Sequence, residues 1–309
     1  MGNNRPKVLV ILAAFNGADW LEEQVNSILC QTGVDVTLTI GDDASTDHTK
    51  TLLNKLAQDQ RIRLLPSLQP SGSAAKNFFR LIKHCSAENF DLVAFSDQDD
   101  IWFRTKLQTA YASLQKRPDA AGYSSATIAT WSDGRRRLQT QSTRTTQSDF
   151  LFEGAGQGCT FALQVAFYNQ FRTLIYENPW LIKTIHYHDW AAYAVARATN
   201  HTWIFDSKPT VLYRQHSGND TGARRSPRGA IRRLKLISNG WYKNQIIAIS
   251  AIAHAANPSS NALTSWETLA KSPNTIARQL KLFRFIVAGG RRKFIDTVLI
   301  AFAALCGMI

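Results

Sequence analysis

The N-terminal third of the chain alternates between short apolar runs and longer amphipathic stretches. The runs have the length and bulk of buried strands, and in the stretches apolar residues recur at helical spacing. The strand-like runs cover residues 7–15, 34–40, 61–65 and 92–95, and the helical ones 18–31, 48–56 and 75–84. Strands that alternate with helices predict an α/β fold with a doubly wound, mostly parallel sheet and helices on both faces.

Beyond residue 100 the pattern becomes mixed and then helical. We expect a helix over 102–115, a strand over 122–131, a mobile polar loop over 135–149, a helix over 190–198, a strand over 210–213 and helices from Gly229 onward. These patterns predict an α/β domain over residues 1–222, with halves of about 1–102 and 103–222. A helical region over 223–309 would follow it.

Charge divides the chain at the same place. Residues 224–309 hold 14 Lys and Arg against 2 Asp and Glu, while the whole chain holds 36 and 23, so the part before is almost balanced. A basic region interleaved with apolar stretches suits an anionic membrane surface. The four cysteines are scattered, and the N-terminus lacks the apolar core of a signal peptide. We therefore expect reduced thiols and a cytoplasmic protein.

The C-terminal segment 294–309 is strongly apolar and follows Arg291, Arg292 and Lys293. It is shorter than the roughly 20 apolar residues that a membrane-spanning helix needs. We expect a helix that lies in the membrane interface, with the preceding cations against lipid phosphates. A buried C-terminal helix and a contact between two copies are the alternatives, and the oligomeric state stays open.

The strand over 92–95 ends in Ser96-Asp97-Gln98-Asp99-Asp100, which puts three carboxylates within four residues. Carboxylates this close repel one another unless a cation neutralises them, and their hard oxygen atoms suit Mg²⁺ or Mn²⁺. In an open parallel sheet, ligands bind beyond the carboxyl ends of the strands. The cluster therefore predicts a divalent metal site. The alternative, an aspartate that caps a following helix, is the better interpretation for Asp100 alone.

Four motifs in order give the chain a resemblance to the inverting family 2 glycosyltransferases, which have the GT-A fold. They are Phe15-Asn16-Gly17, Asp42-Asp43-Ala44-Ser45-Thr46-Asp47, Ser96-Asp97-Gln98-Asp99-Asp100 and His188-Asp189-Trp190. The resemblance covers roughly residues 6–222. Together with Ser96 to Trp102, the segment Tyr213 to Asn219 is most similar to the bacterial rhamnosyltransferases of surface polysaccharide synthesis.

This resemblance implies a nucleotide-sugar donor and a lipid-linked saccharide acceptor. The favoured donor is dTDP-rhamnose, a UDP-sugar such as a UDP-hexose is the alternative, and the enzyme would lie on the inner face of the plasma membrane. Asp97 and Asp99 would hold the metal, which stabilises the departing diphosphate. Asp99 is expected as a direct ligand, whereas Asp97 shares the metal or binds the ribose, and Asp100 lies behind them.

The resemblance also assigns residues to the donor. Asp43, more than Asp42, would bind the base or ribose. Arg214 and His216 would close over the diphosphate, Arg214 as a forked phosphate donor and His216 as a third metal ligand or a hydrogen-bond donor; a solvated loop is the alternative. The remaining donor contacts would come from Ala14, Phe15, Asn16, Gln98, Lys76 and Asn77.

Three of these assignments have alternatives. Phe15 would serve core packing equally well, and Lys76 and Asn77 would serve as an ordinary solvated helix start instead of a phosphate site. Ala44 stands where the family more often has glycine, so the turn there must avoid a positive φ or tolerate it at a cost.

Inversion needs a base that takes the acceptor's proton, and Asp189 matches the position of the family's catalytic carboxylate. The alternative role, capping the helix over 190–198, is compatible with catalysis. His188 is expected to orient its surroundings. The segment Gly154 to Cys159 lacks the full dinucleotide-binding spacing, and we assign it to the acceptor side, where small residues would let a sugar approach.

Two functions of other classes compete. The pI of about 9.8 and the aromatic residues beside cations suggest a nucleic-acid-binding protein, but the acidic clusters would repel a polyphosphate, so we expect no nucleic-acid partner. A catalytically silent sugar-binding scaffold is the other, and it predicts that loss of Asp189 changes nothing.

Overall fold

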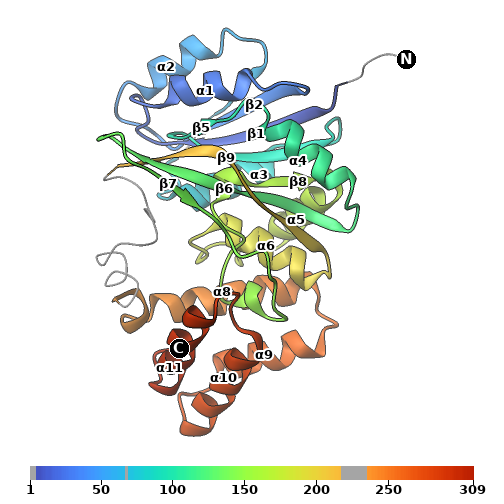
Figure 1. The fold of residues 1–309 in the computed structure, drawn as a ribbon, viewed down its shortest axis with the longest axis vertical. Coiled ribbons are helices and arrows are strands. Elements are labelled where there is room, and N and C mark those ends of the chain that lie inside the picture. The colour runs from blue at the N-terminus through green and yellow to red at the C-terminus, as the bar shows by residue number, and fades with distance from the viewer. Residues whose placement is uncertain (1–4, 67–68, 217–234) are drawn as a thin grey trace.

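The structure is a computed structural model that describes residues 5–66, 69–216 and 235–309. One sheet lies at the N-terminal end of the molecule, and the C-terminal helices form the opposite end (Figure 1). Its nine described strands follow the order β3-β2-β1-β4-β8-β6-β9-β5, with β7 beside β6. The strands are β1 Lys7–Ala14, β2 Asp35–Asp42, β3 Ile62–Leu65, β4 Leu92–Asp97, β5 Ile101–Trp102, β6 Ala120–Trp131, β7 Arg136–Gln139, β8 Ala162–Gln164 and β9 Thr202–Gln215.

The first four strands of this order pair in parallel, and the other pairs include both parallel and antiparallel ones. Strand β1 lies between β2 and β4, and the register sets Ala14 opposite Asp42 and Ala13 opposite Asp97. Strand β8 runs antiparallel to β4 and β6, whereas β9 runs parallel to β6. The predicted α/β fold is confirmed, and the register brings the carboxyl ends of β2 and β4 to the same edge.

The helices form where apolar residues recur at helical spacing. In α3 (Ala74–His84) the buried Phe78, Phe79 and Ile82 share a face, and the Ser73 side chain caps the start by accepting from the backbone N–H of Lys76 at 3.3 Å. The other helices are α1 Leu21–Leu29, α2 Thr49–Leu56, α4 Lys106–Gln115, α5 Val165–Glu177, α6 His188–Ala198, α8 Trp241–Ala256, α9 Asn261–Lys271, α10 Ile276–Gly289 and α11 Phe294–Leu305; the 3₁₀ turns are η1 Asp149–Leu151 and η2 Gly158–Thr160.

Two expected elements are wrong. The helix over 102–115 begins only at Lys106, because Ile101 and Trp102 form β5 and pair with β9. Asp100 therefore precedes a strand and caps no helix. The expected loop over 135–149 contains β7, which pairs with β6 as a hairpin, and η1 begins at Asp149. Both segments form strands because their backbones pair with another strand. The spacing of apolar residues along the sequence does not reveal such pairing.

The C-terminal helices share a core with the helices on one face of the sheet. Trp266 of α9 stacks on Phe285 of α10 and meets Phe152 edge-on. The Tyr242 hydroxyl donates to the carbonyl oxygen of Phe152 at 2.6 Å. The region is therefore packed on the sheet domain, while the proposed boundary at 222–223 lies outside the described residues.

Two of the cations expected to face lipid pair with carboxylates of the sheet domain instead, and of these Arg292 is buried and Arg291 half-buried. The Arg292 guanidinium lies 3.5 Å from Asp149 and 3.4 Å from Glu153, and Arg291 lies 3.2 Å from Glu153. Buried carboxylates require such partners, because an uncompensated buried charge is costly. The expectation is wrong for both arginines, whereas Lys293 is exposed. In the described part of the chain, every helix is too short or too polar to cross a bilayer.

Candidate active site

The site is built at the edge where β1, β2 and β4 end. Gln98, just after β4, holds the loop that follows β1: its Oε1 accepts from the Phe15 backbone N–H at 2.7 Å, and its Nε2 donates to the Phe15 carbonyl at 2.8 Å. The Phe15 ring is 53% exposed, so Phe15 does not pack in the core. Gln98 thus positions Phe15 at the mouth of the site.

The loop after β2 is tied together by its own carboxylates. Asp42 accepts from the backbone N–H and the hydroxyl of Ser45. Asp43 accepts from the backbone N–H groups of Ser71 and Gly72 at 2.5 and 3.1 Å. Ala44 adopts a left-handed φ of 62°, so the turn tolerates a conformation that glycine adopts more cheaply. The two aspartates shape the loops of the site, and their contact with a nucleotide stays a prediction.

Asn16 also has a left-handed φ, of 47°, and its Oδ1 accepts from the Thr46 backbone N–H at 2.8 Å. This bond joins the loop after β1 to the loop after β2. Ala14, the last residue of β1, is buried. Both residues therefore lie where β1 ends, and their place at a base pocket stays a prediction.

Lys76 and Asn77 on α3 separate in the structure. Lys76 is exposed, whereas Asn77 is buried. The Nδ2 of Asn77 donates to the Gly41 carbonyl at 2.8 Å, and its Oδ1 accepts from Arg80 at 2.9 Å. Asn77 therefore anchors α3 to the end of β2, and this geometry gives its expected phosphate contact no support.

The structure brings Asp99, Arg214 and His216 together. The Nε2 of His216 lies 2.7 Å from Asp99 Oδ2. Arg214 donates through Nε to the Asp99 carbonyl at 2.9 Å and through a terminal nitrogen to Glu23 at 2.7 Å. The His216 ring also stacks on Trp20, with ring centroids 4.2 Å apart. Residues 217–219 of the same motif lie outside the described residues.

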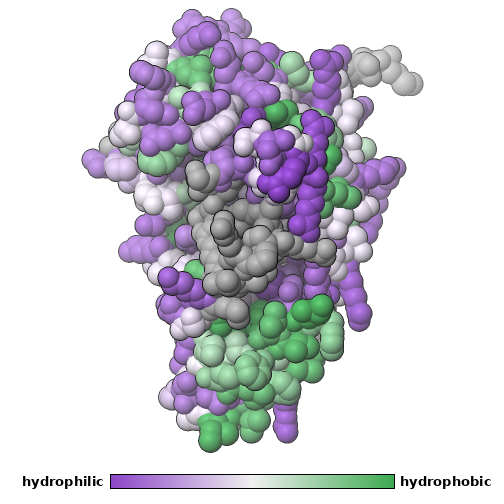
Figure 2. Space-filling view, turned by 60° about the vertical axis from the view of Figure 1, so that its left-hand side comes forward, coloured by the Kyte–Doolittle hydropathy of each residue, from purple (hydrophilic) through white to green (hydrophobic). Residues whose placement is uncertain are grey.

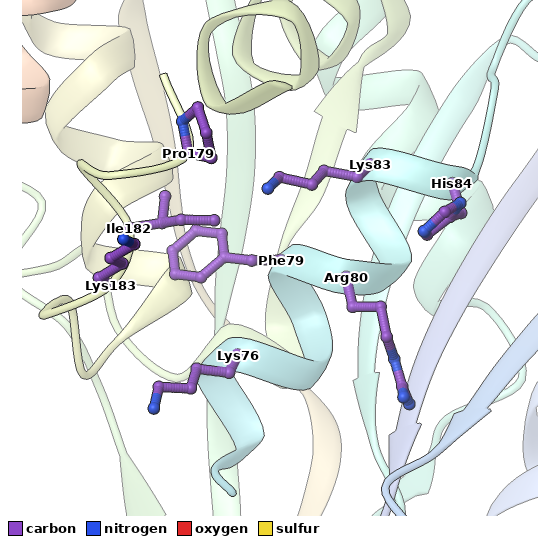
Figure 3. Close-up of a pocket in the computed structure, with 8 residues that line it drawn as sticks. All are labelled: Lys76, Phe79, Arg80, Lys83, His84, Pro179, Ile182 and Lys183. Carbon is purple, nitrogen blue, oxygen red and sulfur yellow. The ribbon is translucent and has the colours of Figure 1, made fainter. Parts of the chain in front are cut away.

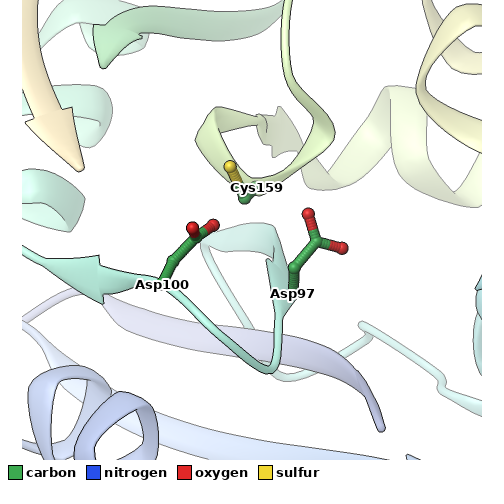
Figure 4. A group of neighbouring side chains, drawn as sticks. All are labelled: Asp97, Asp100 and Cys159. Carbon is green, nitrogen blue, oxygen red and sulfur yellow. The ribbon is translucent and has the colours of Figure 1, made fainter. Parts of the chain in front are cut away.

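Behind this pair lies a buried acidic cluster. Ligand atoms of Asp97, Asp100 and Cys159 all lie within 4.8 Å of one another, and Figure 4 shows the three side chains beside one another. Burial, with the neighbouring charge of Asp99, raises the pKa of Asp100 to about 8. One of its oxygens, Oδ2, has no hydrogen-bond partner in the described part of the chain. Crowded carboxylates with an unpaired buried oxygen fit a divalent cation.

The same cluster shows which side chains suit that cation. Burial and the nearby aspartates raise the pKa of the Cys159 thiol well above its ordinary value, so it remains a neutral sulfur and a poor ligand for a hard ion. Lys106 is buried beneath, its Nζ 3.6 Å from the centre of the Trp102 ring, and burial lowers its pKa to about 7. Among the described residues, Asp99 pairs with His216, whereas Asp97 converges with Asp100 and Cys159, so a metal held by Asp97, Asp99 and His216 together stays a prediction.

Asp189 begins α6 on the acceptor side. Its Oδ1 accepts from the Trp190 backbone N–H at 2.7 Å. Turn η2 packs against it, because a Cβ at Gly158 would lie 3.2 Å from the Asp189 Cβ and 3.0 Å from His188 Nε2. The same turn carries Cys159 beside Asp97. Turn η2 thus connects the acidic cluster with the expected base, and its small residue admits α6; whether it also admits a sugar stays a prediction.

His188 has the environment of an orienting residue. Its ring stacks on Phe78 with centroids 3.7 Å apart and meets Phe95 edge-on. Burial lowers its pKa to about 3, so the ring is neutral at physiological pH. Nε2 has no hydrogen-bond partner among the described residues. A neutral, stacked imidazole fixes the start of α6 by packing.

Sequence reasoning missed three residues of this site: Trp20, Glu23 and Cys159. Trp20 falls within the predicted helical stretch over 18–31, yet it stacks on a histidine almost 200 residues further along the chain. Glu23 had no local feature that marked it. Only the approach of β9 to α1 brings these groups into the site.

Comparisons with known proteins agree with this geometry. The chain is 41% identical to the dTDP-rhamnosyl transferase RfbG of Shigella flexneri over 241 residues, which is 77% of this chain and 83% of that protein. It is 33% identical over 102 residues to the UDP-Glc:alpha-D-GlcNAc-diphosphoundecaprenol beta-1,3-glucosyltransferase WfaP of Escherichia coli, a match that covers 32% of this chain and 38% of WfaP.

The fold is also similar to that of a GT-A glycosyltransferase of known structure. The mannosyltransferase PcManGT from Pyrobaculum calidifontis, solved with GDP-Man and Mn²⁺, superposes with a TM-score of 0.53 at 18% identity over 98% of this chain and 86% of that one. Residues 9–172 match the sequence profile of Glycosyl transferase family 2. With the acidic edge of the sheet and its similarity to a rhamnosyltransferase, the chain belongs to Glycosyl transferase family 2, and it is a glycosyltransferase with the GT-A fold.

Proposed function

We propose that this glycosyltransferase moves rhamnose from dTDP-rhamnose to a lipid-linked saccharide, with a divalent metal and with inversion at the anomeric carbon. The observation that carries the proposal is the arrangement around η2: Cys159 of this turn lies beside Asp97 and Asp100, and Asp189 packs against Gly158 of the same turn. The activity for which RfbG is named supports the donor, and that of WfaP supports an acceptor joined to a lipid through a diphosphate. A UDP-hexose donor is the alternative.

The chain's own residues would divide the work as follows. Asp97, Asp99 and His216 would hold Mn²⁺ or Mg²⁺, which when bound neutralises charge on the departing diphosphate. Asp189, oriented by the Trp190 backbone N–H, would take the proton of the attacking acceptor hydroxyl. Phe15, fixed by Gln98, would cover the base of the nucleotide.

A panel of nucleotide-sugars tests this assignment. With Mn²⁺ present, calorimetry should detect binding of dTDP-rhamnose in preference to UDP-glucose or GDP-mannose, and the Asp99→Asn variant should lose the metal-dependent part of that binding. NMR of the transferred product should show an anomeric configuration opposite to that of the donor. Preference for UDP-glucose would support the alternative donor, and retention of configuration would overturn the mechanism.

We further propose that the C-terminal helices attach the enzyme to the cytoplasmic face of an anionic membrane. Ten of the fifteen most exposed large apolar side chains of the described residues lie within 276–308. On α11 the most exposed of them are Phe294, Ile295 and Phe302. Figure 2 shows the apolar surface gathered at this end of the molecule. The exposed cations Lys281 and Lys293 lie on the same two-helix unit. An apolar face with cations and little acid matches an anionic lipid surface.

Vesicle binding tests this attachment. The triple variant F294Q/V298Q/F302Q should lose most binding to phosphatidylglycerol vesicles, because it removes apolar insertion and leaves the charge unchanged. The double variant L64Q/L138Q, with two exposed apolar residues on the sheet, should bind as the wild type does. If the triple variant bound vesicles normally but sedimented as a smaller species, the face would be a contact between copies.

A further inference from the structure

A second pocket lies outside the acidic site, between α3 and the segment that leads to α6. Its volume is about 540 Å³, within the range of ordinary ligand sites. Figure 3 shows Lys76 and Lys83 of α3 and Lys183 of the facing segment around an apolar floor, whereas Arg80 and His84 point away. The lining residues are Lys76, Phe79, Arg80, Lys83, His84, Pro179, Ile182 and Lys183, with no carboxylate among them.

The three ammonium groups have no counter-ion among the residues that the structure describes. In the described part of the chain none of them forms an ion pair or a side-chain hydrogen bond, and partial burial lowers the pKa of Lys83. Arg80, in contrast, donates to the carbonyl oxygens of Asp42 and Gln69. Gathering like charges without a counter-ion is unfavourable, so the pocket is suited to a polyanion.

The floor adds a second requirement. Phe79, Pro179 and Ile182 are apolar and lie between the lysines (Figure 3). A ligand that satisfies both parts carries phosphate groups next to hydrocarbon. Free sugars have the polar part only, and a nucleotide carries a planar base in place of a hydrocarbon chain.

The pocket borders the acceptor side of the active site. Phe79 faces the pocket, and its neighbour Phe78 stacks on His188, the residue before Asp189. The facing segment runs from Pro179 to α6 and is held by Gln245, which donates to the Thr184 carbonyl at 2.9 Å and accepts from the His186 N–H at 2.8 Å. A ligand in this pocket would therefore lie one helix face away from the start of α6.

We propose that this pocket binds the diphosphate that joins the acceptor saccharide to its lipid. The inference rests on the proposed function and adds the recognition element for its acceptor. Ammonium groups form charge-assisted hydrogen bonds with phosphate oxygens, and the first hydrocarbon units of the lipid cover the apolar floor. The donor's diphosphate binds elsewhere, at the acidic cluster, through the metal.

Paired acceptors test the proposal through turnover. One is a saccharide on a short alkyl diphosphate, and the other is the same saccharide as a plain alkyl glycoside. In K83Q/K183Q the KM for the diphosphate acceptor should rise at least about tenfold, because two charge-assisted bonds are lost. The KM for the alkyl glycoside should not change. Equal changes with both acceptors, or none with either, would overturn the proposal.

A charge-matched control separates the pocket from general electrostatics. The variant K50Q/K116Q removes two exposed lysines on α2 and after α4, and it should behave as the wild type with both acceptors. If it raised the KM as much as K83Q/K183Q does, long-range charge would explain the effect and the pocket would not. Thermal melts would confirm that each variant is folded.

A binding measurement keeps the inference separate from the proposed function. A short prenyl diphosphate is titrated into enzyme that is saturated with dTDP and Mn²⁺, so that no turnover is needed. The wild type should bind it and K83Q/K183Q should bind at least about tenfold more weakly. Equal binding by both proteins would overturn the proposal even if the enzyme transfers sugar. Binding in the absence of any transfer would uphold the pocket and refute the acceptor assignment.

The same variants distinguish the source of the phosphate. If K83Q/K183Q lost binding to phosphatidylglycerol vesicles but kept prenyl diphosphate binding, the pocket would serve bilayer phosphates and the proposal would be wrong. If inorganic pyrophosphate bound as tightly as the prenyl diphosphate, the apolar floor would contribute no affinity. That result would overturn the proposed role of the floor in binding hydrocarbon.

Discussion

Asp189 is the residue on which the chemistry depends most directly. Its replacement by Asn keeps the size of the side chain and an oxygen that can accept from the Trp190 N–H, but removes the ability to take a proton. Turnover should therefore fall on the order of a hundredfold or more, since general-base catalysis contributes about that much. Steady-state assays with a fixed acceptor measure turnover, and calorimetry should show unchanged donor binding. Wild-type turnover by D189N would refute the assignment of Asp189 as the base.

His188 gives a prediction about stability and pH. Burial lowers its folded-state pKa to about 3, against an ordinary value of 6.5. Between these values the unfolded chain binds a proton that the folded imidazole does not, so the stability that His188 contributes falls as the pH drops, by up to about 1.4 kcal/mol per pH unit, while the raised pKa of Asp100 acts in the opposite direction. Urea unfolding between pH 6.5 and 4 measures this slope.

The His188→Phe variant should lose that part of the slope, because Phe can stack on Phe78 in the same way and carries no titratable group. The exposed His48, changed to Gln, serves as the control and should keep the wild-type slope. An unchanged slope in H188F would mean that another group takes up the proton.

At the level of single residues, the sequence predicted the site residues that directly follow strands. It missed those that reach the site only because distant parts of the chain pack together. Asp99 and His216 were expected together and lie 2.7 Å apart. Gln98 was expected to contact a ligand, yet its amide holds the Phe15 backbone. A motif marks a position as special, but it does not say whether a side chain faces a ligand or the chain itself.

Among the elements, η2 connects the two sides of the site, and its glycine allows α6 to approach. A Cβ at Gly158 would lie 3.0 Å from His188 Nε2, whereas one at Gly154 would meet Trp190 only at 3.4 Å, an ordinary contact. Gly158→Ala should therefore displace the start of α6 and cost about 1–3 kcal/mol, as overpacking does. Gly154→Ala should cost less than about 1 kcal/mol in the same urea titration. Turnover should fall in G158A only; equal effects of the two changes would show that the closer contact has no special role.

The predicted elements were most accurate where strands are buried on both faces. Strand β4 was expected over 92–95, and the structure extends it to Asp97. Strand β5 and strand β7 were not expected, because each is short and exists through pairing with a distant or neighbouring strand. Pattern and propensity carry little information about such pairing. The polar segment that contains β7 was therefore assigned to a loop.

On the scale of the whole molecule, the C-terminal helices share an ion network with the sheet domain. The turn before α11 reaches residues 146–154: Thr146 donates to the Gly289 carbonyl, and Arg292 bonds the Gly154 carbonyl at 2.6 Å. These residues lead directly into η2. The α10–α11 unit, which carries the proposed membrane face, is thus joined to the segment that packs against Asp189. Deleting 290–309 would consequently disturb more than membrane contact, which is why substitutions on the exposed face are the sharper test.

Arg292 provides the final prediction. Its replacement by Met leaves Asp149 and Glu153 with fewer buried partners, and breaking a buried ion pair in this way costs about 3–5 kcal/mol. Arg135→Met removes an exposed pair with Asp133 and should cost at most about 1 kcal/mol. The fluorine NMR signals of labelled tryptophans report on both ends of the molecule. Trp266 lies in the C-terminal helices, and Trp102 lies beside the acidic cluster. Because the C-terminal helices share a core with one face of the sheet, both signals should change at the same urea concentration in the wild type and in R292M. An earlier transition at Trp266 alone would mean that the C-terminal helices fold independently and attach only weakly to the sheet domain.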